Sequence, residues 1–359
     1  MTVGTPLVFA SVFVAALLTV VVPAVSAQPI LMNSKFHWQS LPAIPDTEGF
    51  AAPFAGVSNG ALIVAGGANI VGDRWKNPLV KKWYDSAFVL ERPDAAWKCG
   101  FKLPHPCAYG VAITTNGGLV CIGGSDATRH YSEVFLLRWK DGMLTATPLP
   151  NLPKHCANAC GALLEHTIYV AGGIETPTAT EALKTFWALD LNENQPSWRE
   201  IEPWPGPARM LAVAGVQQGS FFLISGASLA ADAEGKPVRE FLRDAYRYTP
   251  CTGWKRIGDL PRPAVAAASP AIPLGSSQLL VISGDDGANI DFQPLERHPG
   301  FPHDILAYDL KTDTWSSIGE TPLSRATVPT VRWNNRIVIP NGEMRPRVRT
   351  PQVWSLQLP

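Results

Sequence analysis

The stretch Ala61-Leu-Ile-Val-Ala-Gly-Gly67 decides the fold, because variants of it return along the whole chain. Each variant is a short apolar run that ends in small residues, which is typical of a strand buried on both faces and followed by a tight turn. The variants begin roughly 50 to 58 residues apart, and they read Leu119-Val-Cys-Ile-Gly-Gly124, Ile168-Tyr-Val-Ala-Gly-Gly173, Phe221-Phe-Leu-Ile-Ser-Gly226, Leu279-Leu-Val-Ile-Ser-Gly284 and Arg336-Ile-Val-Ile-Pro-Asn-Gly342. The chain therefore contains six copies of one strand-and-turn unit.

A second signal follows most copies: an aromatic strand and then a tryptophan, seen at Trp97, Trp198, Trp254 and Trp315. Four short strands per repeat, six times over, predict an all-β fold, a six-bladed β-propeller with kelch-like repeats. A pair of β-sandwiches is the alternative, but it would not require self-similarity at this period. A closed ring of repeats is one domain whatever its length. We therefore expect residues 28–359 to form a single propeller.

The sixth copy lacks one strand, because the chain after it supplies only one further strand, Arg349-Thr-Pro-Gln-Val-Trp-Ser-Leu356, before Pro359. The segment Phe36–Leu41 has the tryptophan and the polar alternation of an outer strand. We expect it to complete the sixth blade by pairing with the strand around Val353–Leu356. Such pairing would remove the open edges of that blade and close the ring.

Residues 1–27 resemble a secretory signal. Residues 1–34 contain no Lys, Arg, Asp or Glu, and a long apolar run leads to Pro23-Ala-Val-Ser-Ala27. A cut after Ala27 is predicted, and the alternative is a retained membrane anchor. The mature protein would then be exported, to the periplasm or the medium, without a membrane attachment.

The charge balance and the spacing of the cysteines argue against nucleic-acid binding, a disulfide framework and a metal site. Thirty basic and thirty acidic residues leave no net charge to attract nucleic acid. The six cysteines have no spacing typical of a disulfide framework, although Cys99 and Cys107 could bridge. Cys107 and Cys156 each stand sixteen residues before the first glycine of their copy, so they should occupy equivalent buried positions. No metal-ligand spacing is present, and no metal or other cofactor is predicted.

Four segments make the chain similar to the kelch-type N-acetylneuraminate epimerases, also called sialic acid mutarotases, and to their cyclically permuted relatives. They are Gly49–Ala68, Lys81-Lys-Trp-Tyr-Asp-Ser86, Ala108-Tyr-Gly-Val-Ala112 and Asn341-Gly-Glu-Met-Arg-Pro-Arg-Val-Arg-Thr350. In the familiar epimerase the last segment precedes the first, whereas here it lies at the far end. In a closed ring the two segments are neighbours in both orders. The resemblance implies mutarotation of sialic acid, a small sugar acid, without a cofactor.

The residue after each glycine pair should face one mouth of the propeller, where loops of all blades converge. These residues are Ala68, Ser125, Ile174, Ala227, Asp285 and Glu343. The two carboxylates are the candidates for chemistry. Glu343 is also the Glu of the N-G-E pattern, which in the epimerase family is the proton acceptor. The alternative for Glu343 is an acid in a surface loop or a hydrogen-bond acceptor that ties blades together. Asp285 is a candidate substrate contact, and the insert 287–302 is a candidate rim or lid.

Three arginines could bind the carboxylate of a sugar acid through paired, charge-assisted hydrogen bonds. Arg349 matches the Arg of the same pattern as Glu343. Arg209 and Arg325 each stand sixteen residues before the glycine-pair position of their copy, at the start of an innermost strand. For these two, a role in tying adjacent blades together is the alternative to ligand contact.

Two other functions remain open at this point. One is a non-catalytic kelch propeller that binds a glycan or a protein, which the architecture alone does not distinguish. The other is a copper-radical oxidase on a kelch propeller, whose Tyr/His metal set and additional domains have no counterpart in the sequence.

Overall fold

The computed structural model describes residues 1, 2, 4 and 36–358. The predicted signal segment, apart from residues 1, 2 and 4, lies outside these described residues. Within them, no helix is long and apolar enough to span a membrane.

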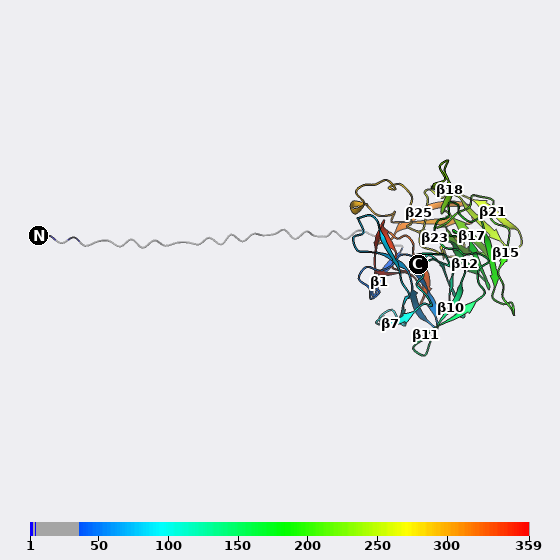
Figure 1. Ribbon diagram of the computed structural model, residues 1–359, viewed down its shortest axis with the longest axis horizontal. Coiled ribbons are helices and arrows are strands. Elements are labelled where there is room, and N and C mark those ends of the chain that lie inside the picture. The colour runs from blue at the N-terminus through cyan, green and yellow to red at the C-terminus, as the bar shows by residue number, and fades with distance from the viewer. Residues whose placement is uncertain (3, 5–35, 359) are drawn as a thin grey trace. The chain divides into compact units, whose positions relative to one another are not determined.

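Six antiparallel sheets of four strands are arranged as the blades of a propeller, as predicted (Figure 1). From the innermost strand outward, blade one contains β2 (Phe54–Ser58), β3 (Ala61–Ala65), β6 (Ser86–Leu90) and β7 (Lys98–Lys102). Blade two contains β8 (Val111–Thr115), β9 (Gly118–Ile122), β10 (Val134–Lys140) and β11 (Met143–Leu149). Blade three contains β12 (Cys160–Leu164), β13 (Thr167–Ala171), β14 (Phe186–Asp190) and β15 (Arg199–Glu200).

The remaining three blades follow the same order. Blade four contains β16 (Val213–Gln217), β17 (Ser220–Ile224), β20 (Ala245–Thr249) and β21 (Gly253–Ile257). Blade five contains β22 (Ile272–Leu274), β23 (Gln278–Ile282), β24 (Asp304–Asp309) and β25 (Thr314–Glu320). Blade six contains β26 (Val331–Trp333), β27 (Arg336–Pro340), β30 (Val353–Gln357) and β1 (His37–Leu41). The six apolar runs of the sequence are the second strands, β3, β9, β13, β17, β23 and β27.

The ring closes through the first strand of the chain, and this prediction is confirmed. Strand β1 pairs antiparallel with β30, with His37 opposite Gln357 and Leu41 opposite Val353. Phe36, just before β1, is buried in the same hydrophobic cluster as Leu356. Blade six is therefore built from both ends of the propeller sequence.

A closed ring of backbone hydrogen bonds joins the six blades around the central axis. Each blade contributes one residue to it, here called the ring residue of that blade. The N–H of each ring residue donates to the carbonyl of the ring residue in the preceding blade, over 2.7 to 3.1 Å. All six have a positive φ, from 49° to 63°, although none is glycine. In ring order they are Ala52, Tyr109, Asn158, Leu211, Ala266 and Thr327.

The repeated glycines allow neighbouring blades to approach each other. The N–H of Gly67 donates to the carbonyl of Cys107 in the next blade over 2.8 Å. A Cβ added at Gly66, whose φ is 68°, would lie 2.3 Å from that same carbonyl oxygen. A larger residue at Gly66 would therefore push blades one and two apart.

The tryptophans of the outer strands tie each blade to the one before it. The indole Nε1 of Trp254 in blade four donates to the carbonyl of Glu202 in blade three over 2.8 Å. Trp315 in blade five does the same to Gly258 in blade four, also over 2.8 Å. Equivalent bonds link five of the blades to their predecessors, through Trp38, Trp97, Trp198, Trp254 and Trp315. The second sequence signal thus marks contacts between blades.

Short two-stranded hairpins rise from three blades on the side where the second strands end. They are β4–β5 (Ala68–Val71 and Val80–Trp83) in blade one, β18–β19 (Ala227–Ala231 and Pro237–Phe241) in blade four, and β28–β29 (Glu343–Arg345 and Val348–Arg349) in blade six. The insert in blade five contains the 3-10 helix η1 (Leu295–Arg297). These elements surround one mouth of the propeller.

We predict that ring closure by β1 is a large contribution to stability. A chain without residues 36–41 should lose the β30 edge bonds and the burial of Phe36 and Leu41, and its Tm should fall by more than roughly 10 °C. Moving the same segment behind Gln357 through a short Asn-Gly turn should restore the Tm, because β30 and β1 are antiparallel neighbours. Calorimetry of the three proteins tests this, and an unchanged Tm in the truncated chain contradicts it.

Candidate functional site

The six residues predicted to face the mouth occupy equivalent positions. Each forms an isolated antiparallel bridge with the residue just before the ring residue of its own blade. The pairs are Ala68 with Ala51, Ser125 with Ala108, Ile174 with Ala157, Ala227 with Met210, Asp285 with Val265, and Glu343 with Ala326. The mouth is therefore directly above the ring, and its two carboxylates belong to blades five and six.

Glu343 begins the blade-six hairpin and is held in a defined orientation. Its Oε1 accepts a hydrogen bond from the backbone N–H of Arg347 over 2.7 Å. Its side chain is 15% exposed, so a carboxylate oxygen remains open to a ligand. The residue before it, Gly342, has a φ of 97°, and a Cβ there would lie 3.0 Å from Val328. Glycine is thus needed where the chain turns into the hairpin.

Arg349 lies opposite Glu343 in the β28–β29 pair. Its Nη1 is 3.4 Å from the Glu343 Oε1, and its side chain is only 6% exposed. Within the described residues, its Nε and Nη1 have no hydrogen-bond partner. The structure therefore brings together an acid and a guanidinium with donors to spare, as the pattern shared by the two residues predicts.

Asp285 and the insert of blade five lie on the adjoining part of the mouth. The Asp285 Oδ1 accepts a hydrogen bond from the N–H of Gly287 over 2.9 Å. Burial, with a smaller contribution from the charge of Asp286, raises the pKa of Asp285. The insert contacts the blade-six hairpin, where the Arg345 Nη1 donates to the carbonyl of His298 over 3.5 Å. The insert is thus placed as a rim beside Glu343.

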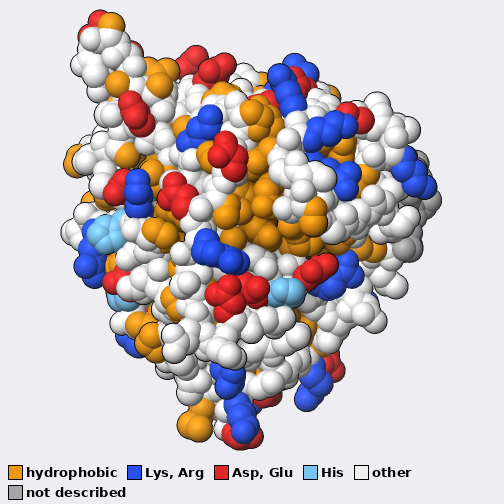
Figure 2. All heavy atoms as spheres, turned by 90° about the vertical axis from the view of Figure 1, so that its right-hand side faces the viewer, with side chains coloured by type: hydrophobic (Ala, Val, Ile, Leu, Met, Phe, Trp, Pro, Cys, Tyr) orange, Lys and Arg blue, Asp and Glu red, His pale blue; other side chains and the backbone are white. Residues whose placement is uncertain are grey.

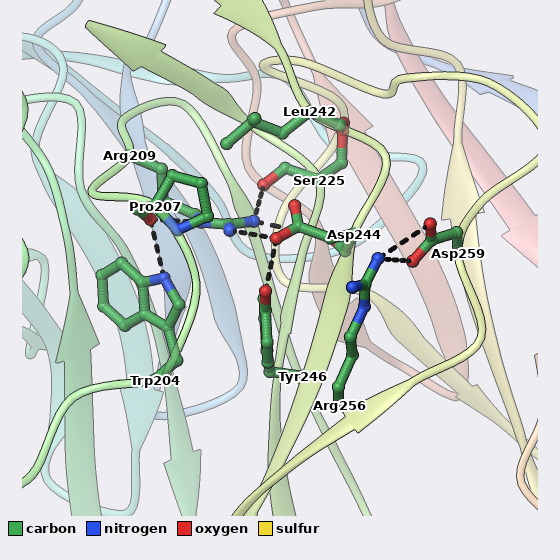
Figure 3. A network of polar contacts seen from close by, with 9 residues as sticks. All are labelled: Trp204, Pro207, Arg209, Ser225, Leu242, Asp244, Tyr246, Arg256 and Asp259. Carbon is green, nitrogen blue, oxygen red and sulfur yellow. Dashed lines mark hydrogen bonds and ion pairs between the residues drawn. The ribbon is translucent and has the colours of Figure 1, made fainter. Parts of the chain in front are cut away.

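Arg209 is placed inside blade four and not beside Glu343 (Figure 3). Its side chain is fully buried and forms a 2.7 Å ion pair with Asp244. It also donates to the carbonyls of Ser225 over 2.9 Å and Pro207 over 3.3 Å. The Tyr246 hydroxyl donates to the same Asp244 oxygen over 2.6 Å. The geometry favours the structural alternative for Arg209, with its donors used within the protein.

Blade five repeats this arrangement with another arginine. Arg262 donates to Asp304 and, over 3.2 Å, to the carbonyl of Ser283, which corresponds to Ser225. Asp304 corresponds to Asp244, because each accepts through its carbonyl the N–H of that serine. Two successive blades therefore each contain a contact between an arginine, an acid and a serine carbonyl.

Blade six departs from the arrangement. Gln352 stands at the Asp244 position, since its carbonyl accepts the N–H of Asn341. Arg325 is 2% exposed, and among the described residues its guanidinium donates only to the carbonyl of Ser324, over 3.0 Å. Its Nε and Nη2 have no partner within the described residues, and burial lowers its pKa to about 10. Arg325 is thus a buried cation without a carboxylate, and its role as a ligand contact stays a prediction.

Sequence reasoning missed a cluster at the part of the mouth formed by blades one and two, next to blade six. The Lys81 Nζ lies 4.1 Å from the ring centroid of Tyr109 and 4.7 Å from that of Trp83. The Trp83 Nε1 donates to the Ser125 Oγ over 3.2 Å. The segments 81–86 and 108–112 stand out in the sequence only by their resemblance to a family. Their meeting at the ring was not visible in their spacing.

A cavity of about 90 Å³ follows the central axis below the mouth. The ring residues line it, together with the first residues of the innermost strands. Glu343 is not part of this lining. Its bridge partner Ala326 precedes Thr327, which does line the cavity. Glu343 therefore lies at the entrance to the channel.

A larger cavity, of about 470 Å³, lies between blades two and three, around Leu136, Leu163 and Leu191. It includes Asn116 and Gly117, in the turn at the far end of those strands from the mouth. Hydrophobic side chains also gather in a hollow on the side of the propeller where β15 and β21 lie, with charged side chains around them (Figure 2). We place the site at the mouth, because charged side chains of several blades converge there, whereas the titratable lining residues of the 470 Å³ cavity, Glu165 and His166, come from a single turn of blade three.

All six cysteines are free thiols, so the possible Cys99–Cys107 bridge is not formed. Cys107 and Cys156 are buried in equivalent positions, as predicted. Their Sγ atoms face the carbonyls of Gly123 and Gly172 over 3.5 Å and 3.4 Å. Burial raises the pKa of Cys156 to about 12, so it is an unreactive core thiol. Among the described residues, no cluster of His, Cys, Asp and Glu could hold a metal ion.

Comparisons with known proteins agree with the resemblance seen in the sequence. Residues 22–146 match the family model described as N-acetylneuraminate epimerase. An N-acetylneuraminate epimerase of Yersinia pestis (strain Pestoides F) is 27% identical over 236 residues, which are 58% of this chain and 57% of that protein. The Haemophilus influenzae (strain PittEE) enzyme of the same name is 28% identical over 230 residues, 58% of each chain. One from Brucella suis is 36% identical over 119 residues, 29% of this chain and 30% of that protein. The chain thus spans a little over half the length of the first relatives it matches.

We predict that the Arg209–Asp244 pair contributes pH-dependent stability. Burial alone would raise the pKa of Asp244, but the hydrogen bond and charge of Arg209 outweigh it, and the pKa is lowered. Asp244→Asn should therefore lower the stability by about 3 kcal/mol near pH 7, through an unpaired buried guanidinium. The contribution is present above the unfolded pKa of about 3.9 and is lost as the pH falls through the lowered folded value. Denaturation at pH 7 and pH 3 should show the difference shrinking.

The matched control is Gln352→Asp, which supplies Arg325 with the acid that blade six lacks. It should stabilise the protein at pH 7 by about 1 kcal/mol, because a charge-assisted bond replaces unpaired donors. Equal loss of stability in Asp244→Asn at both pH values would contradict the ion-pair assignment.

Proposed function

We propose that this protein interconverts the α and β anomers of N-acetylneuraminate by opening and reclosing the sugar ring. The observation that supports this most directly is the placement of Glu343 and Arg349 side by side at the mouth, within the N-G-E-x-x-P-x-x-R-T pattern. The relatives that the chain matches bear the name of this activity. The propeller is proposed to be of the kelch type, as its repeat length indicates.

The chemistry needs a base for the anomeric hydroxyl and a proton for the ring oxygen. Glu343 removes the anomeric proton, the bond between the anomeric carbon and the ring oxygen breaks, and the ring oxygen takes up a proton. The resulting open-chain ketone recloses on either face after rotation. Glu343 can return the same proton, so the cycle consumes nothing. Positioned proton transfer of this kind contributes roughly 10²–10⁴-fold to a rate.

Arg349 has two tasks in this proposal. It gives Glu343 a charge partner, and its remaining donors take the carboxylate that sialic acid carries on the anomeric carbon. Because guanidinium offers parallel N–H donors, it fixes the orientation of that carboxylate as well as attracting it. The anomeric hydroxyl, on the same carbon, is then brought to Glu343.

A non-catalytic propeller that binds a glycan or a protein at the same mouth is the second candidate. It accounts for the buried guanidinium donors but not for an acid oriented by a backbone N–H beside them. We also propose that residues 1–27 direct export and are removed after Ala27. N-terminal sequencing of exported protein tests this, and a sequence beginning before Val22 would refute it.

For Glu343 we predict that replacement by Gln slows anomer equilibration at least roughly a hundredfold, because the shape is kept and the basicity is lost. The measurement is an anomer-resolved proton NMR time course after dissolving crystalline N-acetylneuraminate. Wild-type rates in a folded Glu343→Gln protein would rule out the assigned role.

For Arg349 we predict that Lys is almost as poor a substitute as Ala, since an ammonium keeps the charge but lacks the paired donors. Each variant should weaken recognition of sialic acid by roughly tenfold or more, in line with a charge-assisted bond of about 1.5–3 kcal/mol. Anomerisation and Tm are measured on the same proteins. If Arg349→Ala lowers only the Tm and the folded fraction keeps full activity, Arg349 does not bind the carboxylate.

A further inference from the structure

Lys81 is held in a fixed place by two aromatic rings. It lies on β5 of the blade-one hairpin, on the same face as Trp83, and its Nζ contacts the rings of Tyr109 and Trp83. Trp83 is anchored to Ser125, a mouth residue of blade two. Cation–π contacts use the ring faces, so the ammonium keeps N–H donors for another partner.

This cluster is within reach of a ligand at Glu343. Tyr109 and Thr327 are both ring residues, separated only by Ala52. Paired backbones hold successive ring residues about 5 Å apart, so Tyr109 lies roughly 9 Å across the ring from Thr327. Glu343 is bridged to the neighbour of Thr327, and Lys81 lies against Tyr109. One monosaccharide at the mouth can therefore approach both.

A sugar acid bound at the mouth would bring a second carboxylate to Glu343 and Arg349, so its charge requires a second cation nearby. Glu343 and Arg349 form one pair, and among the described residues Lys81 has no ion-pair partner. A bound sugar acid adds a second carboxylate close to Glu343. Two carboxylates beside one guanidinium would repel each other and leave one negative charge uncompensated in a partly buried site. Arg345 and Arg347 of the blade-six hairpin also lack an ion-pair partner among the described residues, but their guanidinium groups donate to the carbonyls of His298 and Arg74. The Lys81 ammonium makes no such hydrogen bond among the described residues and is held only by the two aromatic rings, so its donors are available to a ligand.

We infer that Lys81, positioned by Tyr109 and Trp83, binds the carboxylate of the sugar acid together with Arg349. The identity of the sugar rests on the proposed function. The bound state then contains two carboxylates and two cations, and the mouth selects a sugar that carries an acid over a neutral one.

The test uses a ligand that binds but does not react. The methyl α-glycoside of N-acetylneuraminate has no free anomeric hydroxyl, and its carboxamide lacks the negative charge. Calorimetric titration of both ligands is carried out on the wild-type protein, on Lys81→Met and on Lys82→Met. Lys82 is the matched control, because it is the next residue of β5, is exposed and lies over Tyr84 at 5.0 Å.

Lys81→Met should bind the acid roughly tenfold more weakly and the carboxamide about as well as the wild type does, while Lys82→Met matches the wild type for both. The inference is overturned if the ratio of acid to carboxamide affinity is the same in wild type and Lys81→Met, or if the wild type does not bind the acid. If the acid binds in a Lys81-dependent way but the wild type does not speed anomerisation, the mutarotase proposal fails and this inference stands.

Discussion

The structure depends on a closed circle of six backbone hydrogen bonds around the propeller axis. Each bond fixes the angle between two blades, and the circle is complete only when all six are made. Its residues adopt a left-handed backbone that costs roughly 1 kcal/mol or more for a residue with a Cβ. Glycine would adopt it freely, yet the chain uses residues such as Tyr109 and Asn158, whose side chains line the axis. The ring thus accepts backbone strain and places side chains at the entrance to the channel.

The blades repeat in architecture but not in their internal polar contacts. Blades four and five each neutralise an arginine with an acid, whereas blade six has Gln352 at the position of Asp244, and Arg325 has no carboxylate partner among the described residues. Within the described residues, buried polar atoms of Asn341 and Arg349 without a hydrogen-bond partner lie in that same blade, whereas blades three and four have one such atom each, in Thr185 and Asp244. Buried polar groups are rarely left without partners unless they serve a function. Blade six therefore leaves several buried polar groups without hydrogen-bond partners among the described residues, and it is the blade that holds Glu343.

Much of the fold could be predicted from the sequence, because apolar runs and glycines recur at a period that only a ring of blades explains. The missing outer strand was found by counting strands in blade six and comparing Phe36–Leu41 with the other tryptophan-bearing strands. Glu343 and Arg349 were found from a local pattern. Lys81 could not be identified from a local pattern. Its partner Tyr109 belongs to another blade, and the two residues become adjacent only through the β4–β5 hairpin. Arg209 and Arg325 stand at the same distance before the glycine-pair position of their copies, so their sequence positions do not distinguish them. Their environments differ in one residue that is distant in sequence, which is Asp244 for Arg209 and Gln352 for Arg325.

The first and last strands of the propeller pair in blade six, which is also the blade that holds Glu343. Strand β1 meets β30 across a sequence separation of about three hundred residues, and the β28–β29 hairpin lies between β27 and β30 of that blade. During synthesis, blades one to five can form from contiguous chain, but blade six must wait for its last strand. The blade that holds Glu343 thus cannot be completed until β30 has been made and has paired with β1. Closure of the ring is therefore a condition for the position of Glu343 at the mouth.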